Sequence, residues 1–230
     1  VGDIHTRFQL VEMAIKKAGK TPLIFLGDIF DGPEGAEGAK KCLDLIRASG
    51  SEMVLGNHEL YPLFFGESQE QLVEAWRIHN EVSDEDGLRI WKEWQQVRNL
   101  LTDDDMEWLR SRPLWVKGHN WVAVHAKVPE GKMPDRFVKG KPTPEQIELV
   151  DNTDPDNFWA NQYKGQHGIA IVGHTRRSKI PNGQCVWDSV RLIDWDAKKG
   201  GPGCIYNVKE KAMDKLENPV IGGMAMVNGM

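Results

Sequence analysis

Residues 22–28 read PLIFLGD, a short apolar run that ends in a glycine and an aspartate. This pattern predicts a buried β-strand whose carboxyl end carries an acid. Residues 52–59, EMVLGNHE, repeat the pattern, and residues 7–18 and 36–48 space their apolar side chains as helices do. A helix thus precedes each strand, which predicts an α/β fold with its chemistry at the strand ends.

The composition limits the class of protein. The chain of 230 residues has 34 acidic and 29 basic side chains and a net charge of −5, which argues against binding of duplex nucleic acid. No apolar run is long enough to span a membrane, so we expect no membrane association. Three widely spaced cysteines favour a reducing, cytoplasmic location. We expect one domain over residues 1–230 and, because the chain begins with Val1, further residues upstream, with a leader segment left open.

Residues 60–112 interrupt the alternation, and we expect them to form a small helical insertion within the domain. Ser68, Ser83 and Thr102 stand at positions typical of helix N-caps. The tryptophans of this region are expected to pack in the core rather than to stack on bases. They are Trp76, Trp91, Trp94 and Trp108.

The second half of the chain predicts more strands. They cover residues 120–126, 169–175, 184–190, 190–195 and 203–208, the last three as an antiparallel meander. Thr143 is expected to cap a short helix, and residues 209–230 show no clear period.

Five polar clusters each follow a strand-like run. They are Gly2-Asp3-Ile4-His5, Gly27-Asp28-Ile29-Phe30-Asp31, Gly56-Asn57-His58-Glu59, His125 and Gly173-His174-Thr175. Carboxylate, imidazole and amide groups together suit a pair of divalent transition ions. One such cluster alone is more often a turn or a structural histidine, but five at successive strand ends favour a metal site.

This order of motifs, GDxH, GDxxD, GNHE, H and GHT, resembles the calcineurin-like metallophosphoesterases. Within them it is similar to the phosphoprotein phosphatase branch, which includes bacterial and phage Ser/Thr phosphatases and symmetrical diadenosine tetraphosphatases. The resemblance spans nearly the whole chain. It implies a four-layered α/β/β/α sandwich.

The resemblance also implies the metal ligands and the catalytic pair. One ion would be held by Asp3, His5 and Asp28, and the second by Asp28, Asn57, His125 and His174. Two divalent ions are implied, with manganese expected and iron or zinc as alternatives. A hydroxide bound to both ions would attack the phosphate. His58 would protonate the leaving group, while Asp31 orients it and keeps it protonated.

The sequence departs from the family pattern where substrate phosphate is bound. Gly32 stands in the place of an arginine, and no arginine follows Trp159. Thr6 replaces the usual glycine after GDxH. Nearby cations are candidates for substrate binding, although any one of them is more simply a solvated charge. They are Arg7, Lys127, Arg136, Arg176 and Arg177, with Lys132, Lys139 and Lys141 in the same basic loop as Arg136.

We therefore expect a binuclear metal-dependent phosphoesterase that hydrolyses a phosphate monoester or a nucleoside polyphosphate anhydride. A protein Ser/Thr phosphatase and a metal- or nucleotide-binding module with weakened catalysis are the alternatives. The substrate would be a phosphorylated small molecule, a nucleotide, an RNA end or a phosphoprotein. Asp194 is expected either near the site or as a strand-end hydrogen-bond acceptor, and the remaining histidines at the surface. These are His79, His119 and His167.

Overall fold

The structure is a computed structural model, and it describes residues 1–80, 83–134, 142–151 and 159–216. Helices α1 (Phe8–Ala18) and α2 (Gly35–Ala48) alternate with strands β1 (Ile24–Phe25) and β2 (Glu52–Met53). The two strands pair in parallel, so the helix–strand alternation predicted from the sequence is confirmed. None of the described helices is both long and apolar enough to cross a bilayer.

The larger sheet is mixed and has four strands in the order β3-β4-β5-β6. They are β3 (Trp115–Lys117), β4 (Trp121–Val124), β5 (Ile169–Val172) and β6 (Val190–Leu192). Strand β3 is antiparallel to β4, and the remaining pairs are parallel. Parallel neighbours bring the carboxyl ends of β4 and β5, where His125 and His174 follow, to one edge of the sheet.

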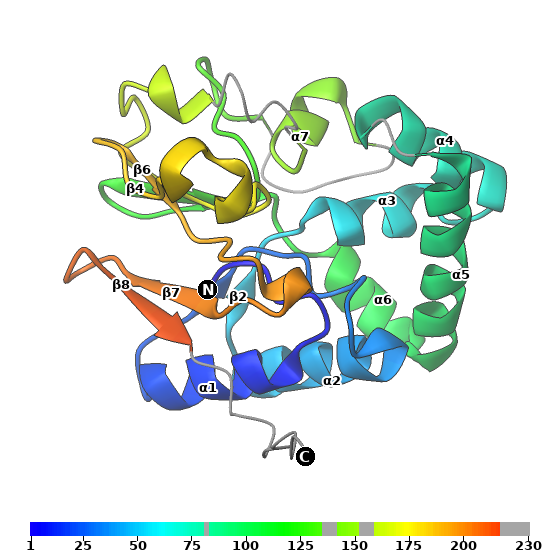
Figure 1. Cartoon of the computed structure of the whole chain (residues 1–230). Coiled ribbons are helices and arrows are strands. Elements are labelled where there is room, and N and C mark those ends of the chain that lie inside the picture. The colour runs from blue at the N-terminus through cyan, green and yellow to red at the C-terminus, as the bar shows by residue number, and fades with distance from the viewer. Residues whose placement is uncertain (81–82, 135–141, 152–158, 217–230) are drawn as a thin grey trace, which may run out of the picture.

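A second layer lies between this sheet and helices α1 and α2 (Figure 1). It contains β1, β2 and the antiparallel pair β7 (Gly203–Asn207) and β8 (Ala212–Leu216). Val1 accepts a hydrogen bond from the backbone nitrogen of Leu26, while the nitrogen of Gly2 donates to the carbonyl of Cys204. Residues 1–2 therefore join β1 to β7 and place Asp3 at the end of that layer.

The core follows from the alternation of side chains along the strands. Val122 and Val124 face the larger apolar cluster, which also contains the buried faces of α1 and α2. Ala123 points the opposite way, into a smaller cluster with Leu26 and Cys204 of the other layer. Two layers of strands thus pack face to face. The α/β class is confirmed, and the four-layered sandwich stays a prediction.

Four helices occupy the region between β2 and β3. They are α3 (Asn57–Phe65), α4 (Gln69–Asn80), α5 (Asp84–Leu100) and α6 (Asp103–Arg110). The three predicted caps are confirmed, because the hydroxyls of Ser68, Ser83 and Thr102 each accept a backbone N–H of their helix. Trp76 and Trp94 are buried, and the other two tryptophans pack on the same core, which confirms their predicted role. A further helix, α7 (Pro144–Glu148), begins at the predicted cap Thr143.

The predicted meander is wrong. Residues 184–189 contribute only an isolated bridge, between Val186 and Arg191. Strand β6 pairs in parallel with β5, and β7 pairs with β8. The turn between β7 and β8 depends on the side chain of Asn207, which accepts hydrogen bonds from the nitrogens of Lys209 and Glu210. Strand β8 also alternates weakly between buried and exposed positions, which hid it from the sequence pattern.

Candidate metal centre

The candidate site lies where several strands end and the backbone turns sharply. Five of the eight non-glycine residues with positive φ in the described structure lie here. They are His5, Thr6, Asp28, Asp31 and His174. Such backbone is unfavourable for ordinary residues and persists only where the surroundings enforce it, which is typical of functional sites.

Glu59 holds the turn that follows β1. Its side chain is fully buried, and its two oxygens accept four backbone N–H groups, from Asp28 at 2.7 Å, Ile29 at 2.8 Å, Gly56 at 3.0 Å and Phe30 at 3.2 Å. Burial and the charge of Asp28 raise the pKa of Glu59 to about 7, although these amide donors favour the ionised form. Glu59 therefore fixes Asp28 relative to the start of α3.

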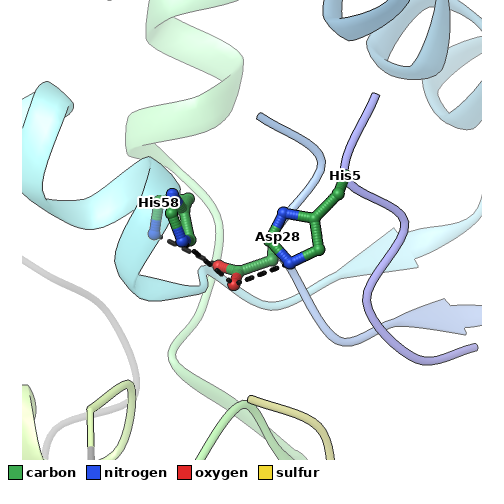
Figure 2. Close-up of side chains that lie close together, drawn as sticks. All are labelled: His5, Asp28 and His58. Atoms are coloured by element: carbon green, nitrogen blue, oxygen red, sulfur yellow. Dashed lines mark hydrogen bonds and ion pairs between the residues drawn. The ribbon is translucent and has the colours of Figure 1, made fainter. Parts of the chain in front are cut away.

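Asp28 is the centre of the cluster. Its Oδ2 atom lies 3.6 Å from Nε2 of His5 and 3.8 Å from Nε2 of His58. Figure 2 shows the carboxylate between the two rings. Its Oδ1 atom lies 3.4 Å from Nε2 of His125. Two groups of metal-binding side chains share this carboxylate, His5-Asp28-His58 and Asp28-His125-His174, each with its ligand atoms within 4.8 Å of one another. The first group contains His58, which the sequence resemblance assigns as an acid, and lacks Asp3.

Asn57 adds an amide oxygen to the second group. Its Oδ1 atom lies 3.2 Å from Nε2 of His125 and 3.3 Å from Nδ1 of His174. The other ring nitrogen of His125, Nδ1, hydrogen-bonds to the carbonyl of Leu26, which fixes the ring with Nε2 towards the cluster. The four predicted ligands of the second ion, Asp28 included, therefore converge.

Asp3 supplies the observation that fits a cation. Its Oδ2 atom accepts the backbone N–H of His174 at 2.9 Å, but its buried Oδ1 atom has no hydrogen-bond partner. Burial raises the pKa of Asp3 despite the nearby histidines. Burial alone would lower the pKa of His125, yet Asp28 and Asp3 raise it to about 10. A proton on this ring thus balances the charge of the buried carboxylates. Divalent ions bound here would displace that proton and supply the positive charge in its place.

His58 lies between Asp31 and a tryptophan. Its Nδ1 atom is 3.2 Å from Oδ2 of Asp31, the contact implied for the catalytic pair, and its ring centroid is 4.9 Å from that of Trp76. Burial lowers the pKa of His58 to about 3, although Asp28 and Asp31 oppose that shift. The predicted role of Asp31, to orient this ring and keep it protonated, stays a prediction.

A family model described as calcineurin-like phosphoesterase matches residues 1–206. The chain belongs to the calcineurin-like phosphoesterase family. The resemblance read from the motifs is thus confirmed, and the family comprises hydrolases that act on phosphate esters and use divalent metals.

Among relatives of this phosphoesterase, the symmetrical bis(5′-nucleosyl)-tetraphosphatase of Chromobacterium violaceum is 30% identical over 131 residues. The match covers 55% of this chain and 41% of that protein, so the chain spans less than half the length of that relative. This distant homology agrees with the phosphoprotein phosphatase-like branch.

Two crystal structures resemble the phosphoesterase fold. A protein proposed to be a diadenosine tetraphosphatase gives a TM-score of 0.65 at 18% identity, over 94% of this chain and 90% of that one. A metallophosphoesterase from Sphaerobacter thermophilus gives 0.55 at 16% identity, over 94% and 87% of the two chains. At these identities the likeness establishes the fold alone.

The predicted substrate-binding cations of the phosphoesterase lie in different places. Arg176 lines a pocket of about 330 Å³ together with His5, Asp28 and His174. Arg7 instead donates to the carbonyls of Ala197 and Gly201, 3.0 Å and 2.5 Å away.

Two more of these cations pair elsewhere. Lys127 lies 3.7 Å from Glu148, and Arg177 donates to the carbonyl of Gly183 at 2.8 Å. Arg136 and the lysines at 139 and 141 lie outside the described residues. Of the predicted cations that lie within the described residues, the structure thus brings only Arg176 to the pocket beside the metal centre.

Two cations of the pocket were missed by sequence reasoning. Arg89 of α5 and Lys198, in a short helical turn over Ala197–Lys199, both line it. Neither residue belongs to a motif of the sequence, because only the fold brings their side chains to the site.

Asp194 fills both roles that the sequence left open. Its Oδ1 atom accepts the backbone N–H of Asp196 at 3.0 Å, and it lines the same pocket. Its Oδ2 atom is buried without a hydrogen-bond partner, and burial with the charge of Asp3 raises its pKa. His119 is exposed and His167 half-buried; the side chain of His79 lies outside the described residues. All three cysteines are free.

Proposed function

We propose that the chain is a binuclear metal-dependent phosphoesterase that hydrolyses the phosphoanhydride of a nucleoside polyphosphate. The observation that carries the proposal is the pair of metal-binding groups that share Asp28. A shared carboxylate is the arrangement by which two ions are held close enough to act on one phosphate.

Two sets of side chains that share Asp28 would bind the two ions. Asp3, His5 and Asp28 would hold one ion, and Asp28, Asn57, His125 and His174 would hold the other. Manganese is the first candidate for both positions. The ions would act as Lewis acids on the phosphate and would activate the attacking water.

The protein's own contribution begins with orientation. Glu59 and the Asp3 carboxylate fix the backbone at Asp28 and at His174, so the ligand side chains are held before substrate arrives. His58 would donate a proton to the leaving oxygen after Asp31 has oriented its ring. Because its pKa is low in this structure, we expect His58 to gain this proton only once substrate is bound.

A nucleotide substrate is favoured by two observations. The relative from Chromobacterium violaceum is a symmetrical bis(5′-nucleosyl)-tetraphosphatase. The pocket beside Asp28 also holds Arg89, Arg176 and Lys198, more cationic groups than a single phosphate requires.

The test is a substrate panel with added Mn²⁺. Diadenosine tetraphosphate, a phosphothreonine peptide, a 5′-triphosphate RNA end and p-nitrophenyl phosphate would be compared by their specificity constants. We expect diadenosine tetraphosphate to be preferred and to release ADP, and EDTA or Asp28→Asn to abolish turnover. Asp188→Asn, an exposed carboxylate, is the control.

Other outcomes of the panel separate the alternatives. Preference for the phosphopeptide would favour a protein Ser/Thr phosphatase. Two bound ions per chain without turnover of any substrate would favour the binding module. A single domain over residues 1–230, with residues 60–112 as an insertion, is part of the same proposal.

A further inference from the structure

Two cations from distant parts of the chain meet on one carboxylate beside the metal centre. Arg89 of α5 donates to Oδ1 of Asp31 at 2.9 Å, and Lys198 donates to Oδ2 of Asp31 at 2.5 Å. Asp31 itself is buried, whereas the side chains of Arg89 and Lys198 are 51% and 31% exposed. Both cations therefore lie on the open side of a carboxylate that faces the pocket.

The charges of this cluster are not balanced by Asp31 alone. Arg89 also lies 2.8 Å from Glu93, one turn along α5. Burial and the neighbouring Asp31 raise the pKa of Glu93 to about 7, although Arg89 and Lys198 oppose that shift. Arg89, Lys198 and Arg176 all line the pocket, which also holds the carboxylates of Asp28, Asp86 and Asp194. The exposed parts of Arg89 and Lys198 offer positive charge to an incoming anion.

The turn at Gly32 has no room for the side chain of an arginine at position 32. A Cβ atom added to Gly32 would lie 2.0 Å from the carbonyl oxygen of His5 and 2.7 Å from Oγ1 of Thr6. The hydroxyl of Thr6 also accepts the backbone N–H of Glu34, so it is fixed in this place. Thr6 and Gly32, the two departures from the family motifs, thus lie next to each other, and Thr6 occupies space that the Cβ atom of an arginine at position 32 would need.

We propose that Arg89 and Lys198 are the specificity-determining cations that bind the non-reacting phosphates of a polyphosphate substrate. This inference rests on the proposed function. Each cation makes one hydrogen bond to Asp31, which it would share with a phosphate oxygen or give up to it, while Asp31 keeps its contact with His58. Because Arg89 belongs to α5, the helical region between β2 and β3 takes part in choosing the substrate.

Binding and turnover of the Arg89→Ala and Lys198→Ala variants test the proposal. The probe for binding is a β,γ-methylene analogue of ATP, titrated calorimetrically into Mn²⁺-loaded protein. We expect each substitution to weaken its binding roughly tenfold, because each removes a charge-assisted contact to phosphate. KM for diadenosine tetraphosphate should rise by a similar factor, with kcat changed much less. Arg89→Lys and Lys198→Arg should restore part of the loss.

Matched controls are Lys92→Ala on α5 and Lys199→Ala beside Lys198, both exposed. The proposal is overturned if Arg89→Ala and Lys198→Ala lower kcat equally for all substrates and leave binding of the analogue unchanged, since the cations would then act only by orienting Asp31. A chain that binds the analogue through these cations but hydrolyses no polyphosphate would reject the proposed function and retain this inference.

Discussion

The Oδ1 atom of Asp151 lies 3.4 Å from Nε2 of His174, on the side of the ring opposite Asn57. The second oxygen of Asp151 accepts a hydrogen bond from the hydroxyl of Tyr61 at 2.6 Å. Both Asp151 and Tyr61 are buried. A carboxylate behind a histidine ligand can fix the ring and its tautomer, so we expect Asp151 to orient His174 with Nδ1 towards Asn57.

Asp151→Asn should therefore weaken one of the two metal sites. We expect a loss of about 10- to 100-fold in Mn²⁺ affinity at the site that contains His174, with the other site unchanged. Calorimetric titration of metal-free protein resolves the two affinities. Asp188→Asn is the exposed control. Equal affinities in the wild type and Asp151→Asn would show that the contact does not orient His174.

His58→Ala separates the role of acid from that of ligand. If His58 is the acid, two Mn²⁺ ions per chain remain bound, and turnover falls by about 100-fold or more for a poor leaving group such as phenol. The loss for p-nitrophenyl phosphate should be much smaller, because that leaving group needs no proton. The measurement pairs metal content with specificity constants for both esters. Loss of one ion, with equal losses on both esters, would instead make His58 a ligand of the first group.

The parts of the site that the sequence could predict are those encoded locally. Asp28 and Asn57 each follow an apolar strand within a few residues, so strand and ligand are visible together. Arg7 could not be placed in this way. Its guanidinium donates to the carbonyls of Ala197 and Gly201, more than 180 residues along the chain, and no local pattern records that contact.

The same reason explains the cations that were missed. Arg89 and Lys198 are separated by more than 100 residues and meet only because Asp31 binds both. Positive charges on an exposed helix or turn are common, and spacing alone does not tell which of them reach a site. The pairing of β7 with β8 was hidden in a similar way, since its turn relies on the side chain of Asn207.

Glu93→Gln should make stability less dependent on pH. The pKa of Glu93 is raised to about 7 in the folded chain. The contribution of this carboxyl group to the unfolding free energy is therefore fully present below the pKa of the unfolded chain, and it is lost as the pH rises through 7. In the metal-free protein the unfolding free energy of Glu93→Gln should exceed that of the wild type by about 1 kcal/mol at pH 8. This value is reduced because the Glu93 side chain is partly exposed.

Urea unfolding in EDTA at pH 5 and pH 8 measures this difference. The gap between Glu93→Gln and the wild type should close at pH 5, where the wild-type carboxyl is protonated in the fold. Glu85→Gln, on the exposed side of the same helix, should show no gap at either pH. A gap that is the same at both values would exclude the titration of Glu93 as its cause.

Glu59→Gln tests whether the turn at Asp28 depends on a carboxylate. The amide has one acceptor oxygen in place of two, and its NH₂ group would face backbone N–H donors that now bind Glu59. At pH 8 we expect a loss of about 3 kcal/mol in unfolding free energy, because buried amide donors are left unpaired. Metal affinity should fall as well, since Asp28 is then less firmly placed. Glu67→Gln, an exposed carboxylate in the same region, should leave both quantities unchanged, and an equally stable Glu59→Gln variant would show that the backbone holds this turn without the carboxylate.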